Sequence, residues 1–297
     1  MLYDITLKIV YEYAHAADSS RHMIRLMPAE LEREQRLIAG TLDVQPRPSE
    51  WINGVDFFGN RFAELAFFSA HEKITFLMQA RVERMERESL LDMSPQLGAL
   101  GQEIYSLPSV EPTAPHHFLG PSPRVPDEPA ITGYAHQALS GQKSVFEAVR
   151  SIGNMIRRDM RYDPEATAVD TPVIEAFRKR RGVCQDYSHI MIAALRGIGI
   201  PAGYVSGFIR TNPPPGKKRL EGADAMHAWV KAWCGNDMGW VEYDPTNGMA
   251  AGIDHVVIAR GRDYSDIAPV RGIMRSYGEH KSEQSVDVVP VTKQPVR

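Results

Sequence analysis

Hydrophobic and polar residues alternate along the first 86 residues, in short runs separated by turn signals. Residues 5–11 (Ile-Thr-Leu-Lys-Ile-Val-Tyr) place an apolar residue at almost every second position, which is the pattern of a half-buried strand. An Asp-Phe-Phe-Gly-Asn sequence at residues 56–60 predicts a turn between two later runs. Antiparallel strands at this spacing predict a small β-sandwich over residues 1–86. The other runs of this kind cover residues 23–27, 35–44, 61–68 and 73–82.

A proline-rich stretch interrupts this pattern between residues 87 and 130. Eight prolines lie between positions 95 and 129, and proline disrupts helices and central strands because it lacks a backbone N–H. We therefore predict a connector with little helix or sheet over residues 87–130. The apolar residues at 104–105, 118–119 and 125 are expected to anchor it across the protein surface.

Helical periodicity begins after residue 130, and we take residues 131–297 as the second domain. Apolar residues recur every three or four positions from Val145 to Met160, as on an amphipathic helix. A short helix is predicted over residues 173–181, and another begins at Cys184 and ends at the glycines and proline of residues 197–201. Mixed helices and antiparallel strands predict an α+β fold. The predicted strands cover residues 204–209, 225–234, 240–244 and 286–291, with an exposed loop at 213–218.

Cys184 has the most distinctive surroundings in this domain. It follows a turn at Gly182 and opens an apolar-periodic helix. Free N–H groups and the positive end of the helix dipole at such a position favour the thiolate, the nucleophilic form of cysteine. His227 and Asp244 follow, one on each strand of a predicted hairpin. A cysteine, a histidine and an acid are the parts that an activated-thiol enzyme needs.

The length of the hairpin loop decides whether His227 and Asp244 can meet. If the loop has an even number of residues, for example residues 235–238, residue 229 pairs with Asp244. Asp244 then shares a face of the sheet with His227, diagonally across the ladder and within reach of a hydrogen bond. An odd loop without a bulge would place the two side chains on opposite faces. The candidate triad therefore predicts the register of this hairpin.

Chemistry assigns a role to each member of the candidate triad. Cys184 attacks a carbonyl carbon, and His227 takes the thiol proton and later gives one to the leaving amine. Asp244 accepts the other imidazole N–H and stabilises the imidazolium. The backbone N–H of Cys184 is one expected donor to the oxyanion, and a second donor is unassigned.

Each of these residues also has a plain structural interpretation. A lone cysteine is more often a small buried hydrophobe, and an aspartate before a proline is usually a turn residue. Their combination favours the catalytic interpretation. Cys234, the other cysteine, lies on the strand face opposite His227 without a helix start before it, so we predict that it is packed.

Three further residues are candidates for contact with a substrate. Trp229 follows His227 on the same predicted strand face and would line a cleft. Gln185 and Asp186 follow the candidate nucleophile and would position the substrate locally. Capping of the helix start is the alternative interpretation for these two residues.

Composition narrows the class of protein. The chain has 297 residues, enough for two domains, and its net charge of -3 gives no reason to expect nucleic acid as a partner. Two cysteines suit a reducing compartment. Asp4 and Lys8 interrupt the apolar start, and no window approaches a membrane span, so we expect a cytoplasmic protein without membrane contact. No calcium loop or metal-ligand cluster is evident, and we predict no cofactor and no metal.

Several sequence blocks resemble the transglutaminase-like superfamily. They are Gly-Val-Cys-Gln-Asp-Tyr-Ser-His at 182–189, His-Ala-Trp at 227–229 and Trp-Val-Glu-Tyr-Asp-Pro-Thr-Asn-Gly at 240–248. The block at 261–272 (Gly-Arg-Asp-Tyr-Ser-Asp-Ile-Ala-Pro-Val-Arg-Gly) is similar to the bacterial branch, in which a β-rich domain precedes the core. The resemblance implies a papain-like, transglutaminase-type core, with Cys184, His227 and Asp244 as its triad.

The same resemblance implies a set of reactions. Relatives act on a peptide or protein amide through a thioester, and they include cysteine proteases, transamidases that use an amine acceptor, and members that have lost activity. We expect hydrolysis of a peptide or isopeptide bond. The alternatives are glutamine transamidation to an amine and a non-catalytic module that binds a peptide or partner. The residues leave the natural substrate and the oligomeric state open.

Overall fold

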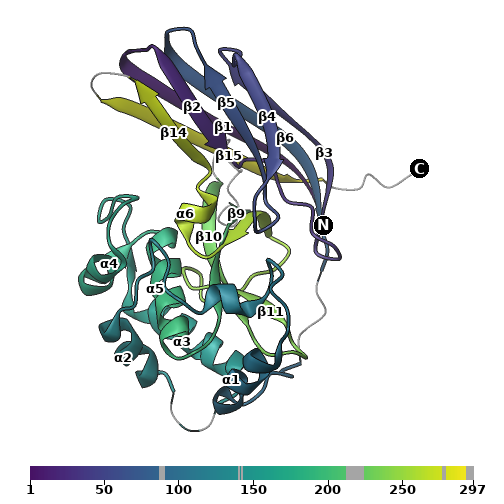
Figure 1. The fold of residues 1–297 in the computed structure, drawn as a ribbon, viewed down its shortest axis with the longest axis vertical. Helices are drawn as coiled ribbons and strands as arrows, with labels where there is room; N and C mark the ends of the chain where they lie inside the picture. Colours follow the sequence, from purple (N-terminus) through teal and green to yellow (C-terminus); the bar gives the residue numbers. More distant parts are fainter. Residues whose placement is uncertain (87–90, 140, 142, 212–223, 276–278, 292–297) are drawn as a thin grey trace, which may run out of the picture.

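The first strands of the chain form part of a β-sandwich. The computed structural model describes residues 1–86, 91–139, 141, 143–211, 224–275 and 279–291 (Figure 1). Along β1 (Leu2–Ala17) every second residue from Tyr3 to Ile9 is buried, which confirms the predicted alternation. The following strands are β2 (Ser19–Ile24), β3 (Gln35–Gln45), β4 (Glu50–Val55), β5 (Arg61–Phe67) and β6 (His71–Arg84).

The last two strands of the chain complete this sandwich. β15 (His280–Pro290) pairs with β1, and β14 (Val270–Arg275) pairs with β2, both antiparallel. The sheet orders are β15-β1-β6-β3 and β14-β2-β5-β4. A late strand was expected near residues 286–291, but its assignment to the second domain, 131–297, is corrected by this pairing. Alternation shows that a strand has a buried face, and it does not show which distant strand it joins.

A five-stranded sheet, covered by helices, forms the core below the sandwich (Figure 1). Its strand order is β12-β11-β10-β9-β13, and α5 (Cys184–Gly197) packs against β9 and β10. Its predicted elements are present, whereas the loop predicted at 213–218 lies outside the described residues. The other elements are α2 (Pro129–Gln137), α3 (Val145–Asp159), β7 (Arg161–Tyr162), α4 (Val173–Lys179), β8 (Arg181–Gly182), β9 (Ala202–Ile209), β10 (Ala225–Trp233), β11 (Trp240–Asp244), β12 (Met249–Ala250), β13 (His255–Gly261) and α6 (Tyr264–Ile267).

The connector contains more helix than its prolines predicted. A ten-residue helix, α1 (Leu97–Ser106), fits between two prolines, and a 3₁₀ turn, η1, covers Pro115–Phe118. Ile104 and Phe118 are buried, as expected of anchors, whereas Tyr105 is exposed. The prolines lie at the ends of these short helices and do not prevent them, because proline is tolerated in the first turn of a helix and just outside it.

Two amide side chains of the sandwich cover the outer edge of β13. The Gln35 amide donates to the Val257 carbonyl at 2.7 Å and accepts the Val257 N–H at 2.8 Å. Asn60 does the same for Arg260, at 2.8 Å in both directions. Each amide takes the place of a neighbouring strand's backbone and pairs with an N–H and a carbonyl group on the edge of β13. The sandwich is therefore held against the core sheet by ladder-like bonds.

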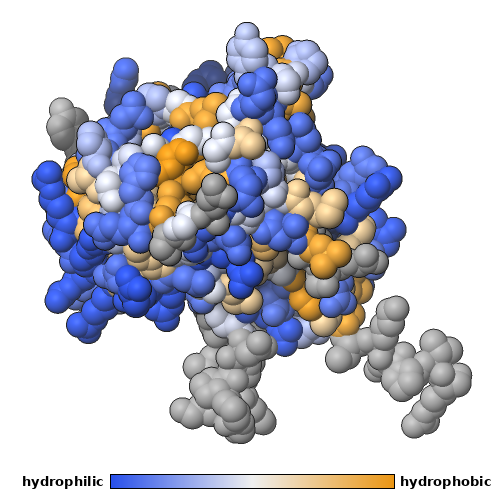
Figure 2. All heavy atoms as spheres, turned by 90° about the horizontal axis from the view of Figure 1, so that it is seen from below, coloured by the Kyte–Doolittle hydropathy of each residue, from blue (hydrophilic) through white to orange (hydrophobic). Residues whose placement is uncertain are grey.

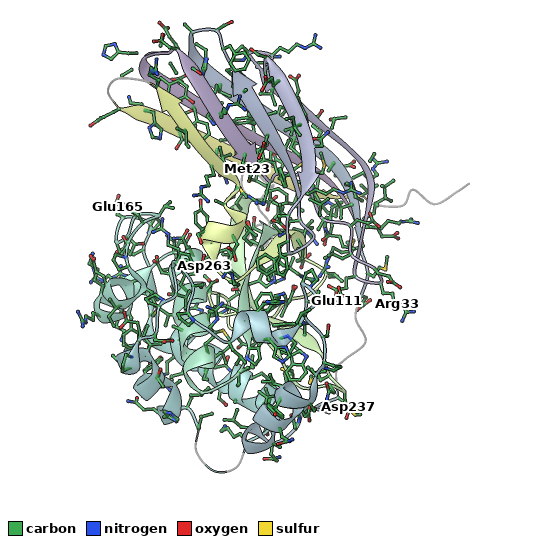
Figure 3. All side chains as sticks on the ribbon, viewed as in Figure 1. Met23, Arg33, Glu111, Glu165, Asp237 and Asp263 are labelled. Carbon is green, nitrogen blue, oxygen red and sulfur yellow. The ribbon has the colours of Figure 1, made fainter. Side chains whose placement is uncertain are left out.

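The turn predicted at residues 56–60 provides one of these two contacts. The Asp56 carboxylate accepts the backbone N–H groups of Phe58 and Asn60, and Gly59 has a φ of 84°. Asp263, near the start of α6 (Figure 3), similarly accepts the Arg124 N–H of the connector at 2.7 Å. Sandwich, connector and core thus meet through buried polar bonds.

The surface of the core end is mostly hydrophilic, with apolar side chains in separate patches (Figure 2). Within the described part of the chain, no helix combines the length and apolar character needed to cross a membrane.

Candidate active site

Cys184 is the first residue of α5, one residue after the short strand β8. The Asp186 carboxylate reaches back to accept the Val183 N–H at 2.8 Å and the Thr167 hydroxyl at 2.7 Å. Gly182 leaves the room for this carboxylate, because a Cβ at that position would collide with it. The glycine turn and the capping aspartate together fix the point at which the helix starts. The thiol they position is partly exposed.

Replacing Gly182 with alanine should disturb this helix start. The added methyl group would push the Asp186 carboxylate off the Val183 N–H, and we expect a loss of about 1–3 kcal/mol of stability together with slower alkylation of Cys184 by iodoacetamide. Gly133→Ala is the matched control, since a Cβ at Gly133 meets nothing within 4 Å. Thermal unfolding and alkylation rates check both variants. A Gly182→Ala protein as stable and as reactive as the wild type would contradict the argument.

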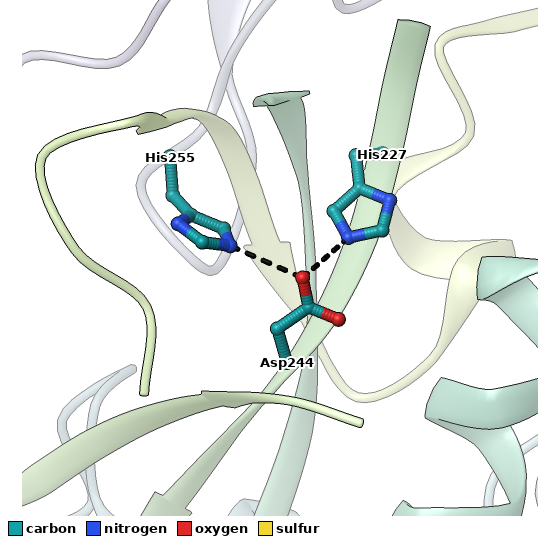
Figure 4. Close-up of side chains that lie close together, drawn as sticks. All are labelled: His227, Asp244 and His255. Carbon is teal, nitrogen blue, oxygen red and sulfur yellow. Dashed lines mark hydrogen bonds and ion pairs between the residues drawn. The ribbon is translucent and has the colours of Figure 1, made fainter. Parts of the chain in front are cut away.

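The hairpin has the register that the candidate triad requires. Lys231 pairs with Glu242, and Trp233 pairs with Trp240. The same register, extended along the strands, places residue 229 opposite Asp244. The loop is therefore even, and His227 and Asp244 lie on the same face of the sheet. Their side chains meet, with His227 Nε2 at 2.7 Å from Asp244 Oδ2 (Figure 4).

Asp244 accepts five hydrogen bonds and is completely buried. Oδ1 accepts the backbone N–H groups of Thr246 and Asn247, at 2.9 and 3.1 Å. Oδ2 accepts the Asn247 side-chain amide at 2.6 Å and two imidazole N–H groups, from His227 and from His255. Burial alone would raise the pKa of this carboxyl, but the donors outweigh it and hold the pKa well below its ordinary value. Asp244 is therefore a carboxylate at neutral pH.

His227 connects this carboxylate to the thiol. Burial would lower its pKa, but hydrogen bonds to Asp244 and to Cys184 raise the pKa to about 10. Because Nε2 is engaged by Asp244, Nδ1 is the nitrogen left for Cys184. The hydrogen bond to a buried carboxylate favours the imidazolium form of His227. The structure brings His227 and Asp244 into direct contact and places Cys184 near enough to affect the pKa of His227.

His255 is a member of this group that the sequence did not reveal. It is the first residue of β13 and its Nε2 lies 3.2 Å from Asp244 Oδ2. His227, Asp244 and His255 have ligand atoms close enough to hold a metal ion. However, His255 Nδ1 accepts the Gly252 N–H at 3.2 Å, which leaves the proton on Nε2. A protonated Nε2 donates to the carboxylate and is not free to bind a metal.

Trp229 lies behind the triad rather than in a cleft. Its side chain is fully buried, its Nε1 donates to Glu242 at 2.8 Å, and its ring stacks beside His227 with centroids 6.1 Å apart. The prediction that it contacts a substrate is wrong in this structure, because no part of the side chain reaches solvent. The strand face was predicted correctly, but the sandwich covers that face.

Gln185 and Asp186 also have structural partners. The Gln185 amide donates to the Val169 carbonyl at 2.8 Å, and Asp186 caps the helix. Both side chains are buried, which favours the structural alternative stated from the sequence and corrects their prediction as substrate contacts.

Cys234 has the opposite environment from Cys184. It is fully buried among apolar residues, and this burial raises the pKa of its thiol to about 12. A thiol that cannot ionise near neutral pH is not a nucleophile. The prediction that Cys234 is packed is confirmed.

Tyr162 is an exposed neighbour of the thiol that the sequence did not single out. It lies on β7, paired with Gly182 of β8. Partial burial and the nearby charge of Cys184 raise the pKa of its phenol. The residue is 54% exposed.

Known proteins match this chain over nearly its whole length. The sequence model of a family described as transglutaminase-like superfamily matches residues 132–245, and that of the bacterial transglutaminase-like N-terminal region matches residues 3–83. An uncharacterised protein of Mycobacterium tuberculosis is 32% identical over 97% of this chain and 92% of its own. An uncharacterised protein of Mycobacterium leprae is 28% identical over 94% of this chain and 95% of its own.

A solved structure shares the fold. The crystal structure of a protein from Cytophaga hutchinsonii, titled a "putative cysteine protease", superimposes with a TM-score of 0.76 at 22% identity, and the match covers 100% of this chain and 92% of that one. The arrangement of sandwich, connector and core is thus common to both proteins.

Proposed function

This chain belongs to the transglutaminase-like superfamily, and from that premise we propose that it is a thiol enzyme that cleaves an amide through a Cys184 thioester. The reaction that we assign is hydrolysis of a peptide or isopeptide bond. One observation carries the proposal: His227 is hydrogen-bonded to the buried Asp244, and Asp244 and Cys184 both lie near enough to raise its pKa. This order of acid, base and nucleophile is that of an activated thiol.

Acylation consumes the thiolate and releases an amine. The Cys184 sulfur attacks the amide carbonyl carbon, and the carbonyl oxygen takes up the negative charge. As the C–N bond breaks, the His227 imidazolium gives its proton to the leaving nitrogen. The products of this half-reaction are a free amine and an acyl group held on sulfur.

Deacylation restores the thiol with water as the acceptor. His227, now neutral, takes a proton from water, and the oxygen attacks the thioester carbonyl. The C–S bond then breaks, the carboxylic acid leaves, and the proton on His227 again faces the sulfur. Cys184 is partly exposed, which supports access of water to the thioester.

Two groups stabilise the charges that develop. Asp244, held as a carboxylate, faces the imidazolium on the side away from the thiol. The Cys184 backbone N–H lies at the start of α5, where the first N–H groups of a helix have no partner within the helix, and it can donate to the oxyanion.

An acyl-donor screen with two cysteine variants tests this proposal. Wild type, Cys184→Ala and Cys234→Ala are incubated with peptides that carry glutamine, peptide and isopeptide amides, with and without a fluorescent primary amine. We expect release of amine or ammonia by the wild type and by Cys234→Ala, and none by Cys184→Ala. Mass spectrometry should detect the acyl-enzyme on Cys184.

The same screen separates the alternatives. Incorporation of the fluorescent amine into the donor would reassign the protein as a transamidase. Peptide binding with equal affinity in wild type and Cys184→Ala, without release or acyl-enzyme, would identify a non-catalytic binding module and overturn the proposal.

A further inference from the structure

We propose that His255 is a positioning residue for this site, which donates its Nε2–H to Asp244 and holds the carboxylate in line with His227. The inference rests on the proposed function, because it assigns a task within that triad. His255 itself reaches neither the thiol nor the open side of the site, since it is fully buried behind Asp244.

Geometry directs both imidazoles at one oxygen. His227 approaches Asp244 Oδ2 at 2.7 Å from β10, and His255 approaches the same atom at 3.2 Å from β13 (Figure 4). The Asn247 amide is the third donor to that oxygen. Because these donors come from different elements of the core, the carboxylate is fixed relative to β10 by more than its own hairpin.

The protonation of His255 follows from its other nitrogen. Nδ1 accepts the Gly252 N–H at 3.2 Å, and the Gly252 carbonyl accepts the backbone N–H of His255 at 3.1 Å. An N–H donor at Nδ1 requires a lone pair there, so a neutral His255 carries its proton on Nε2. The ring also packs edge-on against Trp229, with centroids 5.1 Å apart. His255 is thus a donor to Asp244 that is held in one orientation.

A carboxylate without such donors would be free to rotate. The backbone N–H groups of Thr246 and Asn247 occupy Oδ1, while His255 and the Asn247 amide occupy two sides of Oδ2. What remains on Oδ2 is the direction toward His227. Residues that orient the ligands of metal sites change affinity or activity by about 10- to 100-fold when removed, and we expect an effect of that size for His255.

A pair of amide variants separates the two bonds of His255. In His255→Gln the side-chain amide nitrogen falls near the position of Nε2, so the bond to Asp244 is kept and the bond to Gly252 is lost. In His255→Asn the amide falls near Nδ1, so the Gly252 bond is kept and the Asp244 bond is lost. The readout is the alkylation rate of Cys184 by iodoacetamide, with thermal unfolding measured in parallel.

We expect His255→Gln to stay within about threefold of the wild type and His255→Asn to be slowed by about 10- to 100-fold. The reverse order would assign His255 only to the turn at Gly252 and would overturn the inference. Equal rates in both variants would also overturn it, because the Asp244 bond would then have no separate effect.

A second measurement does not depend on variants that fold. Long-range ¹H–¹⁵N spectra of the wild type report which nitrogen of each histidine carries a proton, and we expect Nε2 of His255. A proton on Nδ1 would overturn the inference. A different result would overturn the proposed function: Cys184 of the wild type would react with iodoacetamide no faster than Cys234, whichever nitrogen of His255 carries the proton.

Discussion

Replacing His227 with alanine should slow the alkylation of Cys184 by about 10- to 100-fold at roughly pH 5.5. At that pH only about one in a thousand side chains of an ordinary cysteine is in the thiolate form. The His227 imidazolium, whose pKa is raised to about 10, lies near this sulfur and can stabilise the negative charge with which the sulfur attacks iodoacetamide. Removing the cation removes this stabilisation, so alkylation should slow. Stopped-flow alkylation with mass-spectrometric assignment of the labelled cysteine measures this effect.

The chain supplies its own controls for this experiment. His136→Ala removes an exposed histidine in the last turn of α2 and should leave the rate unchanged. Cys234 is buried in the wild type, so its labelling in a variant would report a loosened core. Equal rates for wild type and His227→Ala would mean that the thiol is not activated by this histidine, and the triad would lose its base.

The triad could be predicted because its geometry is largely local. Cys184 follows a glycine turn, and Asp186 lies where a helix start needs an acceptor, so the sequence indicates the start of α5. The meeting of His227 with Asp244 depends on the length of one hairpin loop. The loop length fixes the register of the two strands, and because side chains alternate along each strand, the register decides which of them share a face of the sheet.

Contacts between distant elements could not be predicted in this way. β14 and β15 return to the sandwich across more than two hundred residues, as in the pairing of Leu7 with Val286. Trp229 was placed on the correct face, but nothing nearby in the sequence indicated that the sandwich would cover it. Ala29 and Leu31, which pack around Trp229 and Val257, come from the other domain.

His255 shows the same limit within the site. Its position at the start of an apolar strand is typical of many structural histidines. β13, which begins at His255, pairs with β9, and this pairing contains a bulge between Val257 and Ala259. Neither the partner strand nor the bulge follows from the local pattern, so the residue could be assigned only from the structure.

Replacing Asp244 with asparagine should lower the rate of amide cleavage by about 10³- to 10⁴-fold. It should also lower the upper pH limit of activity. The hydrogen bonds and charges of Asp244 and Cys184 raise the pKa of His227 to about 10 against the opposing effect of burial. Without the carboxylate charge, burial acts with less opposition and the pKa of His227 falls. Above that pKa the imidazole is neutral and cannot protonate the leaving amine. The measurement is kcat/KM against pH on a donor from the screen, with a ¹H NMR titration of His227.

The direction of the alkaline shift distinguishes an electrostatic role for Asp244 from a packing role. Asparagine has nearly the same volume, but its NH₂ group would face the N–H donors that surround the site, so some loss of order is expected in either case. Loss of order lowers the rate at every pH, whereas loss of charge moves the titration of His227. Asp237→Asn, on the exposed hairpin loop (Figure 3), controls for the change in net charge. It should leave the cleavage rate and the titration of His227 unchanged. An Asp244→Asn protein in which His227 still titrates near its wild-type value would assign the raised pKa to Cys184 alone. The carboxylate would then be a structural acceptor.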